Sequence, residues 1–330
     1  MPLYIPSITI AANMITNAYL QKNYSQIIEV MDYVINTPTI AGNADAYHNA
    51  SVQLTQIQDY ANAVCLLEHG LNRYPRSADL LADLLLYGLE CRKVSEISTY
   101  YFDKLAKINK KFWTWRAFHF SIDFLMVYIQ YSDTNEQERT VTEEIIALID
   151  AYKTYFPTDE RAYMVEYTFY TLICENQKAL DALKQATETL TVCSQCALNY
   201  ADYYFEHGEY DKVIPIVEKA INVREDQPSI NLGYAYYILA LSKEYVLRHN
   251  SSVLNQDNVT PVFNAYYSAL EFLDTDKQTL ISQIKNRVKI LERESGIESF
   301  ISFDNTDSAI PEKLRKLLNF ENKQNIIDII

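Results

Sequence analysis

The chain has 330 residues, of which 48% are apolar, and a formal net charge of −14 with a pI near 4.8. This length accommodates two ordinary domains or one elongated array, and the apolar content suffices for a continuous core. An acidic chain without a basic face argues against nucleic acid and anionic membranes as partners. A protein or peptide, basic rather than acidic, matches the charge better.

The composition also favours helices and a cytoplasmic location. The chain has only six Gly and nine Pro, which favours long helices joined by short loops. The first residues, MPLYIPSITI, lack the positive region and apolar run of a signal peptide, and no run of about 18 apolar residues predicts a membrane span. The five scattered Cys are expected to be reduced thiols.

The elements predicted along the chain are helical hairpins that recur with a period of about 34 residues. The block at 44–77 predicts two helices, the second beginning near Tyr60 and passing the small Gly70, which permits close helix approach. The block at 194–227 has a similar pattern, with Tyr210 in the place of Tyr60. A fixed period of this length is typical of stacked helical hairpins.

The register extends the repeat over most of the chain. From Tyr60 to Val94 is 34 residues (94 − 60), and from Asn176 to Tyr210 is again 34 (210 − 176), with one longer hairpin between. We predict a repeat region at 1–295 and a tail with a short amphipathic helix at 296–330. The hairpins are expected near 8–40, 44–77, 78–109, 112–157, 159–192, 194–227 and 229–274, with a capping helix at 276–295.

The order of large, small and closing Pro residues in these blocks resembles the tetratricopeptide repeat (TPR). In the block at 44–77 the resemblance is carried by Tyr47, Ala50, Leu54, Tyr60, Ala63, Leu67, Gly70 and Pro75. The block at 194–227 departs from the pattern, since its closing proline is displaced to Pro228 and Val213 replaces the usual Ala. The resemblance implies an all-α fold, a right-handed superhelical solenoid of about seven hairpins, and a non-catalytic scaffold or adaptor role.

The resemblance also indicates which residues face a partner, because the first helix of each hairpin lines a concave groove in this family. The candidates are Asp45, His48, Asn49, Asp79, Asp83, Asn199, Asp202 and Glu206. Chaperone-binding members hold a peptide carboxylate with Lys, Asn and Arg at such positions, and the acids here argue against that clamp. We expect a basic or neutral segment in a concave acidic groove. The alternative is that these acids are simply solvated helix surface.

No group of residues predicts catalysis. Phosphate-binding glycine loops and the common hydrolase and kinase motifs are missing from the sequence. Cys193 and Cys196 have the spacing of a zinc or redox pair, but no second pair of ligands stands at a matching spacing. We favour a structural role for both thiols at the start of a helix, and expect no metal, no cofactor and no enzymatic activity.

Two further features leave alternatives open. Trp113, Trp115 and Arg116 stand at the start of the longest hairpin, either as packing at an irregular junction or as an aromatic contact patch for a partner. The tail at 296–330 is either a partly ordered terminus or a segment that docks into a groove. Docking of the tail would suit an alternative function, a peptide-sensing regulatory protein that acts through a protein partner and is autoinhibited by its C-terminal tail. The sequence indicates no oligomeric state.

Overall fold

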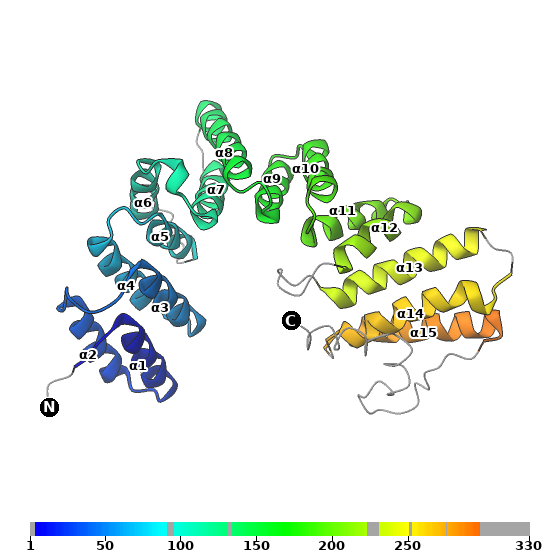
Figure 1. Ribbon diagram of the computed structural model, residues 1–330, viewed down its shortest axis with the longest axis horizontal. Coiled ribbons are helices and arrows are strands. Elements are labelled where there is room, and N and C mark those ends of the chain that lie inside the picture. Colours follow the sequence, from blue (N-terminus) through cyan, green and yellow to red (C-terminus); the bar gives the residue numbers. More distant parts are fainter. Residues whose placement is uncertain are drawn as a thin grey trace, which may run out of the picture. The chain divides into compact units, whose positions relative to one another are not determined.

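A computed structural model describes residues 4–90, 96–130, 134–222, 231–250, 253–274 and 276–297. These residues form fifteen α-helices and one 3-10 turn, and among them there is no β-strand (Figure 1). The all-α class predicted from the sequence is therefore confirmed. No helix in the described ranges combines the length and the apolar character that crossing a membrane requires. Most of the tail, on which the autoinhibition hypothesis depends, lies outside the described residues.

The chain forms two compact units, Met1–Cys174 (unit 1) and Glu175–Ile330 (unit 2). The boundary falls between the two helices that the sequence groups into the hairpin at 159–192. Unit 1 contains α1 (Ile8–Leu20), α2 (Tyr24–Ile35), α3 (Ala44–Gln56), α4 (Tyr60–Arg73), α5 (Ala78–Glu90), α6 (Glu96–Ala106), η1 (Lys110–Phe112), α7 (Trp115–Gln130), α8 (Asn135–Tyr155) and α9 (Glu160–Leu172). Unit 2 contains α10 (Asn176–Thr189), α11 (Gln195–Glu206), α12 (Tyr210–Ile221), α13 (Leu232–Asn250), α14 (Gln256–Phe272) and α15 (Gln278–Ser295).

Helix pairing within unit 1 follows the chain. Consecutive helices pack as the hairpins α1–α2, α3–α4, α5–α6 and α7–α8. The first helices of these hairpins also contact one another in order, from α1 through α3, α5 and α7 to α9. The first helices therefore form one continuous layer, which is the packing expected of stacked helical hairpins. In unit 2 each helix from α10 to α15 packs on the next, and α11 also contacts α13.

The turns inside several hairpins share one backbone conformation. Lys22, Gln58, Cys174 and Gly208 all have a φ between 57° and 73°, in the left-handed region. Lys22, Gln58 and Gly208 lie in the turns between α1 and α2, α3 and α4, and α11 and α12. A left-handed residue closes the first helix and reverses the chain within three residues. Asn23 and Asp59 then cap the helices that follow. The side chain of each accepts a hydrogen bond from the backbone N–H three residues further along the chain.

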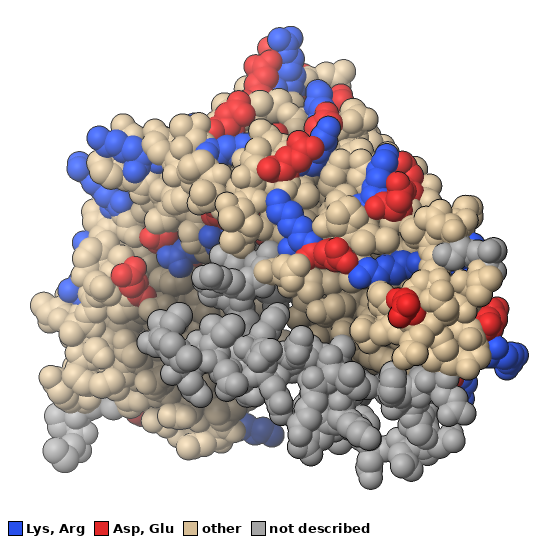
Figure 2. Space-filling model, turned by 45° about the vertical axis from the view of Figure 1, so that its right-hand side comes forward, with Lys and Arg blue, Asp and Glu red and all other residues tan. Residues whose placement is uncertain are grey.

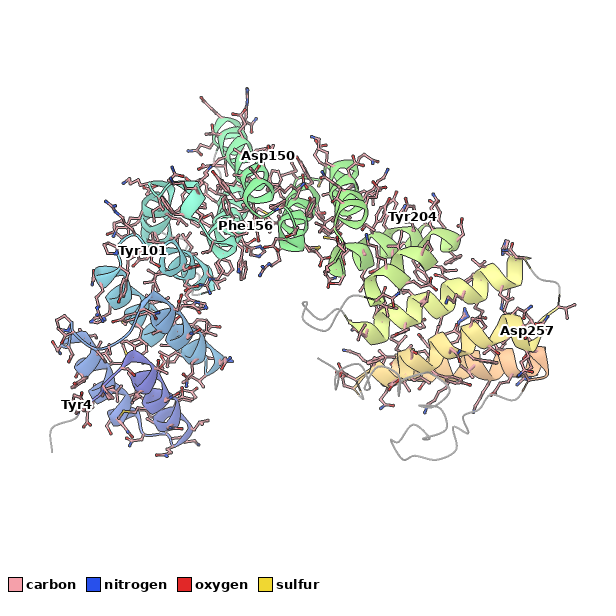
Figure 3. All side chains as sticks on the ribbon, viewed as in Figure 1. Tyr4, Tyr101, Asp150, Phe156, Tyr204 and Asp257 are labelled. Carbon is pink, nitrogen blue, oxygen red and sulfur yellow. The ribbon has the colours of Figure 1, made fainter. Side chains whose placement is uncertain are left out.

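Side chains from both helices of each hairpin fill the core (Figure 3). Tyr47 on α3 is fully buried, and Gly70 on α4 faces it so closely that a Cβ there would lie 2.7 Å from the Tyr47 Cγ. In unit 2 a Cβ at Gly233 would lie 2.8 Å from the backbone nitrogen of Leu273. Both glycines are therefore positions where two helices approach without room for a side chain.

Charged side chains of both signs are interspersed on the face displayed in Figure 2. Acidic and basic groups lie beside one another there, without a large area of one sign. The charge that a partner would meet must therefore be argued from local clusters and not from the net charge of −14.

Candidate partner-binding surface

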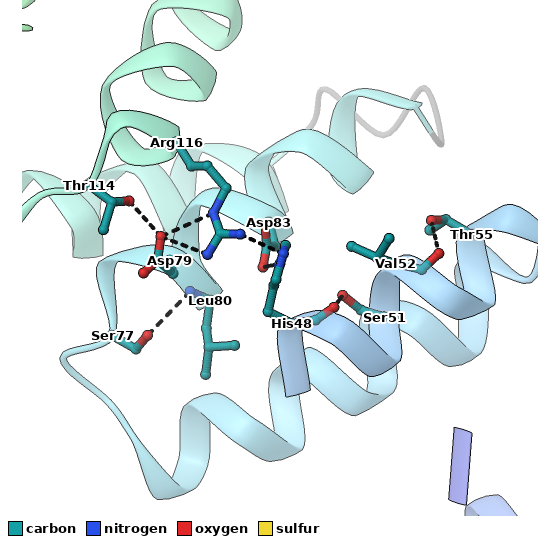
Figure 4. A network of polar contacts seen from close by, with 10 residues as sticks. All are labelled: His48, Ser51, Val52, Thr55, Ser77, Asp79, Leu80, Asp83, Thr114 and Arg116. Atoms are coloured by element: carbon teal, nitrogen blue, oxygen red, sulfur yellow. Dashed lines mark hydrogen bonds and ion pairs between the residues drawn. The ribbon is translucent and has the colours of Figure 1, made fainter. Parts of the chain in front are cut away.

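Five polar residues of unit 1 form one connected cluster across three first helices (Figure 4). We call this cluster the inner network; it consists of His48 on α3, Asp79 and Asp83 on α5, Thr114 just before α7, and Arg116 on α7. Asp79 and Asp83 are four residues apart on one helix, so their side chains lie on the same face. Four of the five were singled out from the sequence, although Arg116 was assigned to a different feature.

The histidine joins the two ends of the network. His48 Nδ1 lies 2.7 Å from Asp83 Oδ2, and its Nε2 is in contact with a terminal nitrogen of Arg116. A guanidinium group can only donate hydrogen bonds, so Nε2 must accept. The ring therefore carries its proton on Nδ1 and donates it to Asp83. In this arrangement His48 is a neutral imidazole between a carboxylate and a guanidinium group.

Arg116 also binds the second carboxylate. Its Nε and Nη2 lie 3.1 and 3.0 Å from Asp79 Oδ1, and the Thr114 hydroxyl donates to the same oxygen at 2.5 Å. All three contacts end on Oδ1, and among the described residues no donor reaches Oδ2. The side chain of Asp79 is 23% exposed, whereas that of Asp83 is 2% exposed. The open oxygen of the network thus belongs to Asp79.

The inner network carries a surplus of one negative charge. It contains two carboxylates and one guanidinium group, and its imidazole is neutral in this geometry. Asp83 is hydrogen-bonded to the neutral imidazole and Asp79 is paired with the guanidinium group, so neither is the unbonded acid that the sequence interpretation assumed. Asp45 and Asn49 on α3 are exposed.

Polar contacts continue along the layer of first helices on either side. Gln53 on α3 donates to Asn13 and Thr16 on α1, at 3.0 Å in each case. The guanidinium group of Arg161 on α9 lies 3.6 Å from the centre of the Trp115 ring on α7. Every neighbouring pair of first helices in unit 1 is therefore linked by polar or cation–π contacts, which hold this face in a defined geometry.

The two tryptophans have different environments. Trp113 is 4% exposed, its indole donates to the Ile108 carbonyl at 3.0 Å, and its ring packs on Phe118 at 5.0 Å. Trp113 therefore belongs to the packing of the junction, and an aromatic contact patch on this surface would lack it. Trp115 is partly exposed beneath Arg161, while Arg116 is part of the inner network.

The remaining groove candidates lie in unit 2, on α11. Asn199 accepts a hydrogen bond from Gln195 at 2.8 Å, and Asp202 accepts one from the Tyr234 hydroxyl on α13 at 2.9 Å. Glu206 is exposed at the end of the helix. Burial raises the pKa of Asp202 above its usual range, Glu206 raises it further, and the bond from Tyr234 opposes both.

The two cysteines of the CxxC sequence are fully buried where α11 begins. Cys193 Sγ lies 4.0 Å from the Thr187 hydroxyl. Reactive thiols are generally partly exposed and near positive charge, whereas buried thiols pack like small apolar side chains. That both thiols have a structural role stays a prediction.

The sequence does not single out the polar cluster around Glu244 on α13. Glu244 is 4% exposed and binds Tyr266 and Arg248. The available signal was a lone acid on the apolar face of a helix, three residues after Leu241 and three before Leu247. A buried acid needs partners, so this position predicts a polar contact inside the core.

Comparison with known proteins finds structural similarity and no sequence relative. No family model and no curated protein matches the sequence. Among solved structures, the chain is similar to a thermophilic TPR protein from Thermus thermophilus, with 16% identity over 62% of this chain and 99% of that chain and a TM-score of 0.43. A tetratricopeptide repeat protein from Parabacteroides merdae matches with 12% identity over 84% of this chain and 97% of that chain, also with a TM-score of 0.43.

The helix order and the contacts between successive first helices describe an all-α fold with stacked helical hairpins in unit 1. The comparisons identify no partner.

Proposed function

We propose that this chain is a non-catalytic scaffold or adaptor that binds a protein or peptide segment on the first helices of unit 1. The observation that carries the proposal is the inner network, in which polar groups from three successive first helices are already connected. Preorganised polar groups lower the ordering cost of binding, because the protein side of the interface does not have to be fixed by the partner.

The charge of the surface favours a basic or neutral segment. The inner network has one surplus negative charge, Asp79 Oδ2 is open, and Asp45 is exposed on the neighbouring helix. A Lys or Arg side chain of the partner would donate to such oxygens with a charge-assisted hydrogen bond. An acidic segment would meet repulsion at the same place, so charge would decide between partners more than it would raise affinity.

The proposal is tested with three libraries of end-blocked 12-residue peptides that differ in one class of residue. The basic library contains Lys and Arg at the variable positions, the neutral library contains Gln, and the acidic library contains Glu. Binding to the full chain is measured by fluorescence anisotropy at low and at high salt. We expect the basic and neutral libraries to bind more tightly than the acidic one, and the preference to weaken with salt because exposed charges are screened. A preference for the acidic library would refute the proposal.

A matched pair of variants locates the surface. Asp79→Asn removes the open carboxylate, whereas Asp150→Asn makes the same change at an exposed position of α8, which is a second helix (Figure 3). We expect binding of the preferred library to weaken about three- to tenfold in Asp79→Asn and to stay unchanged in Asp150→Asn. Equal weakening in both variants would mean that peptides respond to net charge and not to this face.

A further inference from the structure

Unit 2 contains a pocket between α13 and α15 that the proposed function does not use. Its volume is about 270 Å³, below the range of most small-molecule sites, so it suits a single side chain better than a cofactor. The residues lining it are Glu244, Tyr245, Arg248, Arg287, Ile290 and Glu294. Its wall therefore combines two arginines, two acids, an aromatic ring and an aliphatic side chain.

A buried carboxylate organises the inner end of this pocket. Glu244 Oε2 accepts from the Tyr266 hydroxyl at 2.6 Å, and Oε1 accepts from Arg248 Nε at 2.9 Å. Arg248 Nη1 in turn lies 2.7 Å from Glu294 Oε2. Each oxygen of Glu244 thus has a short hydrogen bond, and Arg248 is held between two acids. These four residues are linked by hydrogen bonds and an ion pair, but they include two acids and one arginine, so a second arginine balances their charge.

That second arginine is Arg287. Its Nε lies 3.8 Å from Glu244 Oε2, which is within ion-pair range but beyond hydrogen-bond distance. Its side chain is 30% exposed and has a hydrogen bond with Tyr245. A guanidinium group carries five N–H donors, so one such bond leaves most of them for a further acceptor. With two arginines and two acids the cluster is neutral, and what Arg287 offers among the described residues is N–H donors that no acceptor of the cluster occupies.

The other walls favour an aliphatic stem next to the charged group. The Tyr245 ring stacks on Tyr210 with a centroid distance of 4.3 Å and an interplanar angle of 5°. This stack keeps Tyr245 in place at the rim. Ile290 is 36% exposed on α15, one turn from Arg287 along the same helix. A ligand with methylene groups beside an anionic head would contact both apolar surfaces.

We propose that this pocket binds the carboxylate of a Glu or Asp side chain presented by a partner protein. Arg287 donates to the carboxylate, and the aliphatic stem packs on Tyr245 and Ile290. A phosphorylated side chain offers the same anionic oxygens, and the experiment below separates the two sources. This site lies in unit 2 and prefers the opposite charge to the surface proposed in unit 1, so either can fail without the other.

The ligand class is tested on the full chain by NMR of the arginine Nε–H groups. The probes are three end-blocked peptides, Gly-Ala-X-Leu-Ala-Gly, in which X is Glu, Gln or phosphoserine. We expect the Glu peptide to shift the Arg287 signal in a saturable way and the Gln peptide to leave it in place. The proposal is overturned if the Arg287 signal does not shift with the Glu peptide, or if it shifts equally with the Gln peptide. Binding at least tenfold tighter with phosphoserine than with Glu would overturn the carboxylate assignment.

Variants of α15 locate the interaction. Arg287→Gln removes the proposed donor, and Arg293→Gln makes the same change at an exposed residue of the same helix outside the pocket. We expect Arg287→Gln to weaken binding of the Glu peptide at least about tenfold and Arg287→Lys to weaken it less. Arg293→Gln should leave this binding unchanged. Equal loss in Arg287→Gln and Arg293→Gln would refute the site. If circular dichroism shows that Arg287→Gln is unfolded, the Glu and Gln peptides on the unmodified chain decide.

Discussion

Asp83 in unit 1 and Glu244 in unit 2 are buried acids on first helices, and they are satisfied in different ways. In unit 1, Asp83 is bound by a neutral histidine, and the only arginine of the inner network is shared with Asp79. In unit 2, Glu244 is bound by Tyr266 and Arg248, and Arg287 stands beside them without a short contact to the acid. The first arrangement leaves one negative charge in surplus, whereas the second is neutral overall and leaves a guanidinium group with unoccupied N–H donors.

This difference shows how one fold can present one surface that offers a hydrogen-bond acceptor and another that offers donors. A buried carboxylate must have partners wherever it occurs, because an unpaired charge in the core is costly. The group that keeps an unoccupied hydrogen-bonding position after this requirement is met decides whether the nearby surface accepts or donates. In unit 1 it is the outer oxygen of Asp79, and in unit 2 it is the outer face of Arg287.

The largest effect is expected from Glu244→Ala. The change leaves Tyr266, Arg248 and Arg287 without their shared acceptor inside unit 2, and breaking a buried ion pair on one side costs about 3–5 kcal/mol. Burial and the nearby carboxylate both raise the pKa of Tyr266, so its hydroxyl stays protonated and needs the acceptor. Urea-induced unfolding followed by circular dichroism measures the loss, and hydrogen exchange should locate it in α13 and α14.

The control for this change lies in the same cluster. Glu294 is 43% exposed and contacts only the outer side of Arg248. Glu294→Ala should therefore cost no more than about 1 kcal/mol, as exposed ion pairs usually do. If both alanine variants lose the same stability, Glu244 is not the organising residue of unit 2.

A smaller effect is expected where helices approach most closely. Gly233→Ala would place a Cβ 2.8 Å from the Leu273 backbone nitrogen, and Gly70→Ala would place one 2.7 Å from the Tyr47 ring. Overpacking costs about 1–3 kcal/mol, and the better helix propensity of Ala returns up to about 1 kcal/mol. Because backbone atoms move less readily than a ring, we expect the larger loss at Gly233. Thermal unfolding of both variants measures the order, and the reverse order would contradict this reasoning.

The inner network predicts a graded series of stability losses for three variants in unit 1. Asp83→Ala removes the acceptor of His48 Nδ1 at a buried position and should cost about 1–3 kcal/mol. Asp79→Ala acts at a side chain that is 23% exposed, and its cost should stay below about 1 kcal/mol. Asp83→Asn keeps an oxygen acceptor and should fall between them. Chemical unfolding of the three variants checks the series, and equal costs for Asp79→Ala and Asp83→Ala would contradict the burial argument.

The fold was predictable because the spacing of large and small residues along the chain reflects how the two helices of a hairpin pack against each other. Tyr47 is large and Gly70 is small for the same reason, since the ring of one occupies the space that a side chain of the other would need. The hairpin turns were less visible. In the described turns between paired helices, Lys22, Gln58 and Cys174 adopt the left-handed conformation without being glycine, and Gly208 alone carries the residue type that signals it.

The candidate site was predictable by residue but not by pairing. The helical period places His48, Asp79 and Asp83 on first helices, yet Asp83 meets a histidine 35 residues away and Arg116 meets the same ring across 68 residues. Such contacts depend on the offset between neighbouring helices, which the period does not specify. The sequence therefore treated the acids as free and gave Arg116 to an aromatic patch, whereas the structure joins them. That the resulting surface binds a partner stays a prediction.

The smallest effect is expected at Asp202 in unit 2, where burial disfavours the charged form of the carboxyl group. Its pKa in the folded protein is raised above the ordinary value of about 3.9 for an unfolded chain. Between these two values the folded state binds more protons, so the free energy of unfolding rises as the pH falls through the folded pKa and levels off below the unfolded one. Asp202→Asn keeps an oxygen for the Tyr234 hydroxyl and removes the charge. At neutral pH we expect the free energy of unfolding of this variant to equal that of the parent or to exceed it by less than about 1 kcal/mol. In acid this difference should vanish. Unfolding measured at a series of pH values tests this, and a variant that is less stable than the parent at neutral pH but not in acid would show that the ionised carboxylate of Asp202 stabilises unit 2.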